Sequence, residues 1–159
     1  MSRLPDLKFH HIGILVEDIE ACSYDYADNF GYEIRSKIIH DPFQAAYARF
    51  LALPAETTYI ELIAPDSPQS HLQNALKRSP GPHHLCFSTL DIERSLENMC
   101  SQGGMILGPP VPAVAFHNRR IAWLMDRHCL LVELVERGAN GELEFSLATE
   151  KSTVDPPAL

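Results

Sequence analysis

The chain has 159 residues, of which 45% are hydrophobic and 21% charged, with a formal net charge of -8 and an isoelectric point near 5.4. This composition excludes a fibre or a disordered chain, and the length suits one compact unit or two small halves that share a core. The negative charge argues against a nucleic-acid partner, because such binding depends on clustered Lys and Arg.

The first half of the chain predicts a strand, a helix and three further strands. HIGILV alternates β-rich residues, and Asp18 stands as an N-cap before a segment whose apolar residues recur at helical spacing. Gly31 occupies the position at which a glycine commonly ends a helix. We therefore expect strands at 11–16, 32–38, 44–53 and 57–63, with a helix between Asp18 and Gly31.

The second half repeats this plan. A shift of 73 residues lays His11 on His84 and Asp18 on Asp91. We expect strands at 84–89, 105–107, 119–126 and 130–136, with a helix from Asp91 to Gln102. The predicted organisation is a first βαβββ module over 8–66, a linker helix over 67–82, a second module over 83–137 and a tail over 138–159, all in a single structural domain.

One histidine and one glutamate recur at matched spacing in both halves. His11 precedes Glu61 by 50 residues, and His84 precedes Glu133 by 49. Both acids are flanked by strand formers, although Glu is depleted in strands and costly to bury without a partner. Taken singly, a strand histidine is more often a core residue and a strand glutamate more often faces solvent. The argument for a shared site therefore depends on the duplicated pairing.

The side-chain alternation of a strand predicts where these groups point. His11 lies on one face of its strand, and Ile12 and Ile14 lie on the other, where they can pack on the helix. If both sheets curl toward a pseudo-twofold axis, two imidazoles and two carboxylates meet in a cleft and suit one divalent ion such as Zn, Ni, Co, Mn or Fe(II). The candidate metal ligands are His11, Glu61, His84 and Glu133. By the same rule, His10 and His83 should point away from His11 and His84 if the strands are regular, as helix-side or edge residues.

Four stretches resemble the vicinal oxygen chelate superfamily, most closely its methylmalonyl-CoA epimerase and glyoxalase I branch: HHIGILVEDIE, TYIELIAP, GPHHLCF and LLVELVE. The resemblance spans residues 8–136. It implies the glyoxalase/bleomycin resistance/dioxygenase fold, an α+β class in which two tandem βαβββ modules form a U-shaped mixed β-sheet cleft with helices outside. It also implies one divalent metal ion per chain (Co, Ni, Mn, Zn or Fe) and a homodimer.

The same resemblance implies a metal-dependent isomerase or lyase, epimerase-like or glyoxalase-like. Its substrate would be a small 2-oxo compound or an acyl-CoA, from which a proton next to a carbonyl or thioester is moved. The ion would act as a Lewis acid on neighbouring oxygens and stabilise the enediolate that forms when the proton leaves. Glu133, or Glu61 opposite it, would leave the metal partly or wholly to serve as base, and would return the proton to either face.

Two further residues are candidates for substrate binding. The epimerase branch places a second catalytic Glu in the third strand of its first module, and the best-matching position here is Tyr47. A phenol is a poor base near neutral pH, so Tyr47 would donate a hydrogen bond to a substrate oxygen or would merely pack. Arg120, its counterpart 73 residues later, would clamp a carboxylate or phosphate, or would stay solvated at a strand end.

Two other functions stay open at this point. An Fe(II) ring-cleaving dioxygenase needs two His and one carboxylate, and the candidate ligands contain that set, although Glu61 would fill a position that such an enzyme leaves open. A non-catalytic small-molecule or antibiotic-binding protein of the same fold would line the cleft with aromatics and lack the metal residues.

The four cysteines are scattered and contain no C-x-x-C pair. The sequence also shows no apolar leader and no run of 18 apolar residues. We therefore expect a reduced, cytoplasmic protein without a membrane partner.

Overall fold

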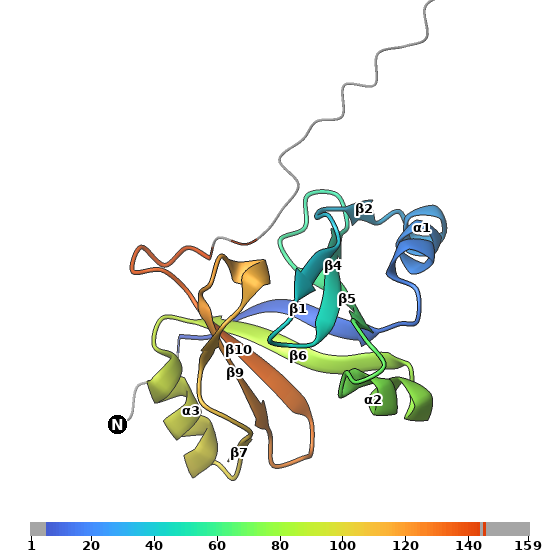
Figure 1. Ribbon diagram of the computed structural model, residues 1–159. Coiled ribbons are helices and arrows are strands. Elements are labelled where there is room, and N and C mark those ends of the chain that lie inside the picture. The colour runs from blue at the N-terminus through green and yellow to red at the C-terminus, as the bar shows by residue number, and fades with distance from the viewer. Residues whose placement is uncertain (1–5, 144, 146–159) are drawn as a thin grey trace, which may run out of the picture.

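The computed structural model describes residues 6–143 and 145, and it joins ten strands of that part of the chain into one mixed sheet (Figure 1). The first half contains β1 (Lys8–Leu15), α1 (Ile19–Phe30), β2 (Glu33–Ile34), β3 (Ile39–Asp41), β4 (Ala46–Ala52) and β5 (Tyr59–Pro65). After α2 (Leu72–Arg78), the second half contains β6 (Gly81–Thr89), α3 (Ile92–Ser101), β7 (Met105–Ile106), β8 (Val111–Pro112), the 3-10 turn η1 (Val114–Phe116), β9 (Arg120–Met125) and β10 (Leu131–Glu136).

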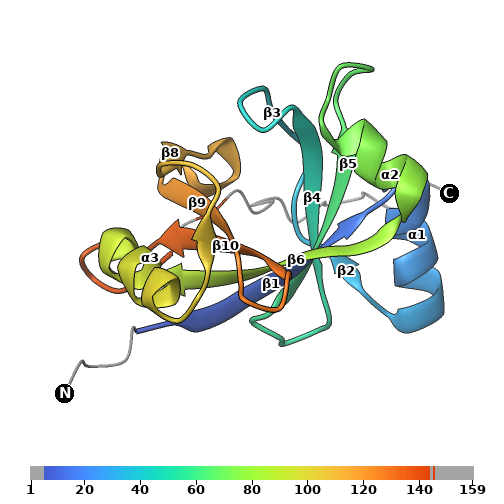
Figure 2. The ribbon, with the colours of Figure 1, turned by 90° about the horizontal axis from the view of Figure 1, so that it is seen from below.

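The two halves of the sheet have matching strand arrangements and meet at its centre. The strand order is β2-β4-β5-β1-β6-β10-β9-β7, with β3 on β4 and β8 on β9. In each half the first strand lies parallel to the last, as β1 beside β5 and β6 beside β10. The antiparallel pair β1 and β6 joins the halves, and the outer strands rise from it as two walls (Figure 2). The predicted α+β class, with a mixed sheet and outer helices, is confirmed.

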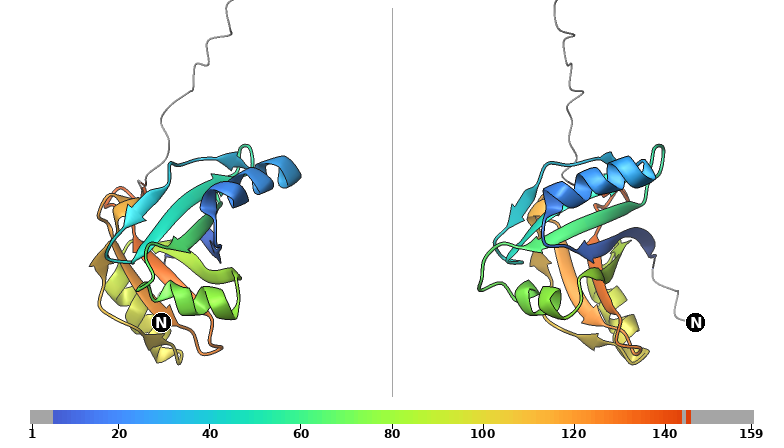
Figure 3. Two further views of the ribbon diagram at one scale, coloured as in Figure 1. Left: turned by 45° about the vertical axis from the view of Figure 1, so that its right-hand side comes forward. Right: turned by 90° about the vertical axis from the view of Figure 1, so that its right-hand side faces the viewer.

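Each wall carries one helix on its outer face, and both helices begin at the predicted cap. Asp18 Oδ1 accepts a hydrogen bond from the backbone N–H of Ala21 at 2.9 Å, and Gly31 ends α1 with a φ of 75°. Asp91 caps α3 in the same way through Arg94 N–H. Figure 3 shows α1 and α3 on opposite sides of the molecule. The inner faces are left to form a site, apart from the part of the first wall on which Leu72 of α2 packs against Ala46, Ala48 and Ile63.

The core follows this division into outer and inner faces. Under α1 the outer cluster contains Ile19, Leu51, Ile60 and Leu62, with Ile12 and Ile14 of β1 against it. Under α3 the matching cluster contains Ile92, Leu96, Ala122, Leu124, Val132 and Leu134. Packing of Ile12 and Ile14 beneath the helix confirms the predicted facing of β1.

The prediction of one strand over 32–38 is wrong in detail. It contains only β2, and β3 begins at Ile39. The Ser36 hydroxyl accepts a hydrogen bond from the backbone N–H of Phe50 at 2.9 Å, so a side chain replaces a strand partner at this point of β4. This interruption separates the two short strands.

Two predictions concern the ends of the chain and the membrane. The predicted tail over 138–159 lies outside the described residues except for 138–143 and 145. None of the helices in the described part of the chain combines the length and apolar character needed to cross a bilayer.

Candidate metal centre

The four candidate ligands lie in two rows that cross the centre of the sheet. In one row, Gly13 of β1 stands between Glu61 of β5 and His84 of β6. In the other row, Cys86 of β6 stands between His11 of β1 and Glu133 of β10. Each row therefore pairs the histidine of one half with the glutamate of the other. Both rows face the inner side of the sheet, away from the helices.

A small residue in the middle of each row makes room for the imidazoles. A Cβ placed on Gly13 would lie 2.0 Å from Cε1 of His84, which is far inside van der Waals contact. Cys86, at the equivalent position of the second half, is fully buried beside His11. Sequence reasoning did not identify either residue as part of the site. The feature of the sequence that could have identified them is their position, two residues after each aligned histidine.

The ligand atoms lie close enough to share one ion. His11 Nε2 lies 3.0 Å from Glu61 Oε2 and 3.3 Å from Glu133 Oε2, and the corresponding distances from His84 Nε2 are 3.3 and 3.5 Å. The two Nε2 atoms are 3.0 Å apart, and all four ligand atoms lie within 4.8 Å of one another. Ligands at about 2.1 Å from a metal are separated by roughly 3.0–3.4 Å, so these spacings fit a divalent ion.

The burial of the four groups also fits a bound cation. The most exposed of the four residues, Glu61, has 7% of its surface accessible, and the others have 4% or less. Glu133 Oε2 is a buried carboxylate oxygen without a hydrogen-bond partner among the described residues, although it lies within ion-pair distance of both histidines. Buried carboxylates are stable only when they are paired or bound to a metal. The donor set of two imidazoles and two carboxylates matches Zn, Ni, Co, Mn or Fe(II).

The charges of the four groups are strongly coupled. Burial alone would raise the pKa of Glu61 and Glu133, but contacts with His11 and His84 outweigh it, so both pKa values fall. Burial would lower the pKa of His11 and His84, but the neighbouring carboxylates outweigh it and both values rise. The carboxylates are therefore charged near neutral pH, and a metal would displace protons from the imidazoles.

The prediction that His10 and His83 point away from His11 and His84 is wrong. On β1, Phe9 pairs with Phe87 and His11 with Cys86, so His10 is an extra residue in the ladder. On β6, His83 is the extra residue between the partners of Gly13 and Ile14. Such a β-bulge re-aims a side chain that regular alternation would send to the other face. The two bulges lie at equivalent positions of the two halves.

Because of the bulges, each metal-facing imidazole contacts a second imidazole through its other nitrogen. His10 Nδ1 lies 2.8 Å from His11 Nδ1, and His83 Nδ1 lies 3.0 Å from His84 Nδ1. Partners of this kind fix the tautomer and the ring orientation of a metal ligand. Burial, with the adjacent histidine adding to it, lowers the pKa of His10 to about 3 and that of His83 to about 4, so both are neutral acceptors.

A cavity of about 460 Å³ opens over the ligand cluster between the two walls. Its walls are mostly apolar, and its polar lining includes Asp41, Gln44, His71 and His83 beside the ligands themselves. Above the central strands, two hydrogen bonds connect the walls, from Trp123 Nε1 to Gln44 Oε1 at 3.0 Å and from Val114 N–H to Asp41 Oδ2 at 3.1 Å. They hold the two walls together beside the cavity. Gln44, Asp41 and His71 were not predicted as site residues.

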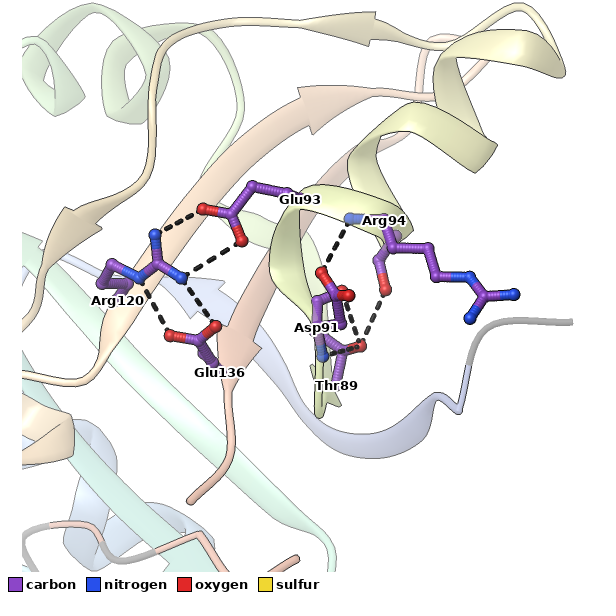
Figure 4. A network of polar contacts seen from close by, with 7 residues as sticks. Thr89, Asp91, Glu93, Arg94, Arg120 and Glu136 are labelled. Carbon is purple, nitrogen blue, oxygen red and sulfur yellow. Dashed lines mark hydrogen bonds and ion pairs between the residues drawn. The ribbon is translucent and has the colours of Figure 1, made fainter. Parts of the chain in front are cut away.

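The structure does not bring Tyr47 and Arg120 to the cavity. Phe50 lies opposite Glu61 and Trp123 opposite Glu133, so strand alternation sends Tyr47 and Arg120 to the outer face. Tyr47 packs against His40 with ring centroids 4.8 Å apart. Arg120 Nε and Nη2 donate to Glu136 at 2.9 and 2.7 Å, and its guanidinium also pairs with Glu93 at the start of α3 (Figure 4). Neither residue is placed to bind a substrate in this cavity.

The fold and the site together define a known class of protein. The family model of the glyoxalase/bleomycin resistance protein/dioxygenase superfamily matches residues 10–123. The chain belongs to this superfamily, as the sequence resemblance indicated. Within it, the ethylmalonyl-CoA/methylmalonyl-CoA epimerase of Cereibacter sphaeroides is 29% identical over 131 residues, which cover 80% of this chain and 96% of that protein.

Solved structures point to the same branch. Methylmalonyl-CoA epimerase from Mycobacterium tuberculosis superimposes with a TM-score of 0.74 at 26% identity and covers 88% of this chain and 93% of its own. A variant of methylmalonyl-CoA epimerase from Streptomyces coelicolor, in complex with 2-nitronate-propionyl-CoA, has a TM-score of 0.70 at 25% identity over 83% of this chain and 98% of its own. These relatives support an epimerase of the superfamily.

Proposed function

We propose that this chain is a divalent-metal-dependent epimerase that moves the proton next to the thioester carbonyl of a 2-substituted acyl-CoA such as methylmalonyl-CoA. The observation that carries the proposal is the convergence of two imidazole nitrogens and two carboxylates beneath a largely apolar cavity. The relatives named as methylmalonyl-CoA epimerases support the choice of substrate class. A 2-oxo compound, as in a glyoxalase-like reaction, is the alternative substrate for the same groups.

His11, Glu61, His84 and Glu133 would hold the ion. A divalent ion bound there would act as a Lewis acid and stabilise the negative charge that develops on a substrate oxygen when the proton leaves. The two carboxylates offset the charge of the ion, so the occupied centre carries no net charge. His10 and His83 keep the two imidazoles in the orientation that points Nε2 at the centre.

Glu61 and Glu133 are the groups proposed to move the proton. They come from β5 and β10, which flank the central strands β1 and β6, so they lie on the two sides of the histidine pair. Both are charged near neutral pH because contacts with His11 and His84 lower their pKa values. One carboxylate would take the proton from one face of the substrate carbon, and the other would return a proton to the opposite face.

Deuterium exchange tests this proposal. Protein loaded with Co²⁺ is incubated with a single epimer of methylmalonyl-CoA in heavy water, and the product is followed by NMR and by its configuration. We expect deuterium at carbon 2 of the inverted product, and loss of exchange after chelation. An absence of exchange in protein that holds the ion would contradict the proposal. Oxygen uptake with a catechol would favour the dioxygenase, and ligand binding without turnover would favour the binding protein.

The homodimer implied by the family resemblance stays a prediction. Sedimentation equilibrium of the full chain tests it, with twice the mass of the chain as the expected result.

A further inference from the structure

The two duplicated histidine pairs differ in what surrounds the supporting ring. His10 lies in an aromatic cluster with its ring centroid 5.2 Å from Tyr59, 5.5 Å from Phe116 and 4.7 Å from Phe145. Its Nε2 is shut off from solvent and has no hydrogen-bond partner among the described residues. His83, at the equivalent position, is half-buried and lines the cavity over the ligand cluster. Equivalent rings therefore face a closed core in one half and the cavity in the other.

The contact between His83 and His84 determines which nitrogen of His83 carries a proton. An imidazole that binds an ion through Nε2 carries its own proton on Nδ1. His84 Nδ1–H would then donate to His83 Nδ1, which lies 3.0 Å away. The neutral His83 ring must therefore carry its proton on Nε2. This atom makes no hydrogen bond within the described part of the chain and, unlike Nε2 of His10, is not shut off from solvent.

Apart from His83 and the ligands, the side chains of the cavity lining that can donate to an anionic substrate are His71, the amide NH2 of Gln44 and the indole of Trp123. Of the described residues that line it, none is Lys or Arg, whereas three are acidic: Asp41, Glu61 and Glu133. The indole N–H of Trp123 already donates to Gln44 Oε1. A substrate carboxylate placed beside these acids needs an N–H donor, because an unpaired charge in an apolar cavity is costly. His83 Nε2–H is a donor held beside the ligand cluster by its contact with His84.

We infer that His83 is a substrate-binding residue whose Nε2–H donates a hydrogen bond to a carboxylate oxygen of an acyl substrate. The inference rests on the proposed function and extends it by naming the group that recognises a free carboxylate on the acyl chain. His10 has no such role, because its Nε2 faces Tyr59, Phe116 and Phe145 instead of the cavity. The duplication thus supplies two supporting rings, of which only one reaches the substrate.

Two substitutions at this position separate substrate binding from support of His84. In His83→Asn the amide oxygen takes the place of Nδ1 and can accept the bond from His84, but nothing replaces Nε2–H. In His83→Gln the amide reaches the position of Nε2 and can donate, but the acceptor for His84 is lost. Calorimetry measures the affinity of each variant for Co²⁺ and, with Co²⁺ bound, for 2-nitronate-propionyl-CoA and methylmalonyl-CoA.

For His83→Asn we expect Co²⁺ affinity within about threefold of wild type, and affinity for both acyl-CoA probes to fall about tenfold. For His83→Gln we expect the reverse, with Co²⁺ affinity falling about tenfold and acyl-CoA affinity largely retained. His40→Asn is the matched control, since His40 pairs with Asp66 and packs on Tyr47 at the outer face. It should change neither affinity.

The outcomes distinguish this inference from the proposed function. Unchanged acyl-CoA affinity in Co²⁺-loaded His83→Asn would overturn the role of His83 and leave the epimerase proposal standing. Equal losses of Co²⁺ and acyl-CoA affinity in both variants would show that His83 acts only through His84, which also overturns it. Wild-type protein that binds neither Co²⁺ nor an acyl-CoA would overturn both proposals.

Discussion

The two halves of the molecule are alike at the ligand cluster and differ around it. His11 and His84, and Glu61 and Glu133, occupy equivalent strands, and each histidine Nε2 lies 3.0–3.5 Å from an oxygen of both carboxylates. The residues next to the ligands differ between the halves: Gly13 stands in the middle of one row and Cys86 in the middle of the other. Farther along the sheet, Phe50 of the first half corresponds to Trp123 of the second.

This comparison teaches which parts of a duplicated fold are fixed by chemistry. An ion that takes two ligands from each half constrains both copies equally, so the four ligands keep the symmetry. The neighbours of the ligands serve different needs, since His10 of the first half is enclosed by aromatic rings from both halves, whereas His83 of the second half lines the cavity. The asymmetry fits a substrate that is itself asymmetric.

The largest expected effect comes from replacing one of the two equivalent carboxylates. Glu133→Gln and Glu61→Gln should each slow epimerisation by about 10²–10⁴-fold, because each removes one group that accepts or returns a proton. If the two acids serve opposite faces of the substrate, each variant should still exchange the proton of one epimer, and a different epimer in each case. Deuterium wash-in with separate epimers measures this.

Glu136→Gln is the matched control for the first prediction, since Glu136 lies three residues farther along β10 and pairs with Arg120 on the outer face. It should epimerise at the wild-type rate. Loss of exchange for both epimers in one of the variants Glu133→Gln and Glu61→Gln, with exchange of both retained in the other, would mean that a single base serves both faces.

The next effect concerns the small residue in the row of His84. Gly13→Ala places a methyl group 2.0 Å from the His84 ring, so the ring must move from the cluster. We expect a loss of about 1–3 kcal/mol in the free energy of unfolding, together with weaker Co²⁺ binding. Urea unfolding and calorimetry measure the two effects.

Gly108→Ala provides the control for this steric effect, because a Cβ at Gly108 meets no atom within 4 Å. Its free energy of unfolding should stay within about 0.5 kcal/mol of wild type. A Gly13→Ala protein that unfolds like wild type and binds Co²⁺ equally well would show that the His84 ring is not held in this position.

The ligand cluster was predictable from the sequence because strands have a period of two and the chain repeats itself. His11, Glu61, His84 and Glu133 lie on regular strand segments, so alternation alone gave their facing. The error at His10 and His83 has a physical cause, since a β-bulge is defined by the pairing of two strands and not by local composition. The repeated HH dipeptide was the visible sign that both positions share a role.

The outer-face position of the two predicted substrate-binding residues has a similar explanation. Tyr47 and Arg120 were aligned by position in their strands, whereas their facing depends on which residue pairs with the glutamate of the next strand. That partner is Phe50 for Glu61 and Trp123 for Glu133. Register between distant strands follows from packing of the whole sheet, so sequence spacing alone did not determine it.

A smaller effect is expected from pH on metal-free protein. His11 and His84 gain carboxylate partners that raise their pKa values, so the stability from this pairing is fully present below the unfolded value of about 6.5. It is lost as the pH rises through the folded values. Urea unfolding without metal should therefore show lower stability at pH 9 than at pH 6.

Divalent metal should reverse this trend, because coordination requires neutral imidazoles. Stability in saturating Co²⁺ should exceed that of the metal-free protein by a larger margin at pH 9 than at pH 6. Metal-free protein that gains stability between these pH values would contradict the assigned pairing.

The smallest effect is expected at the outer face. Arg120→Met removes the ion pairs with Glu93 and Glu136, which are partly exposed at the surface and therefore contribute little. The urea midpoint should fall slightly, and less than in Gly13→Ala, while epimerisation and acyl-CoA affinity stay unchanged. Tyr47→Phe should likewise leave turnover unchanged. Loss of acyl-CoA affinity in either variant would show that the substituted residue does contribute to substrate binding.

The most direct test of the account is the binding of one ion by the four converging groups. Equilibrium titration of metal-free protein with Co²⁺, followed by its visible absorption and by elemental analysis, measures the stoichiometry and the affinity. We expect one ion per chain in the wild type and affinity at least about 100-fold lower in His11→Ala and in His84→Ala. Wild-type protein that takes up no ion, or binding that both substitutions leave intact, would contradict the central claim.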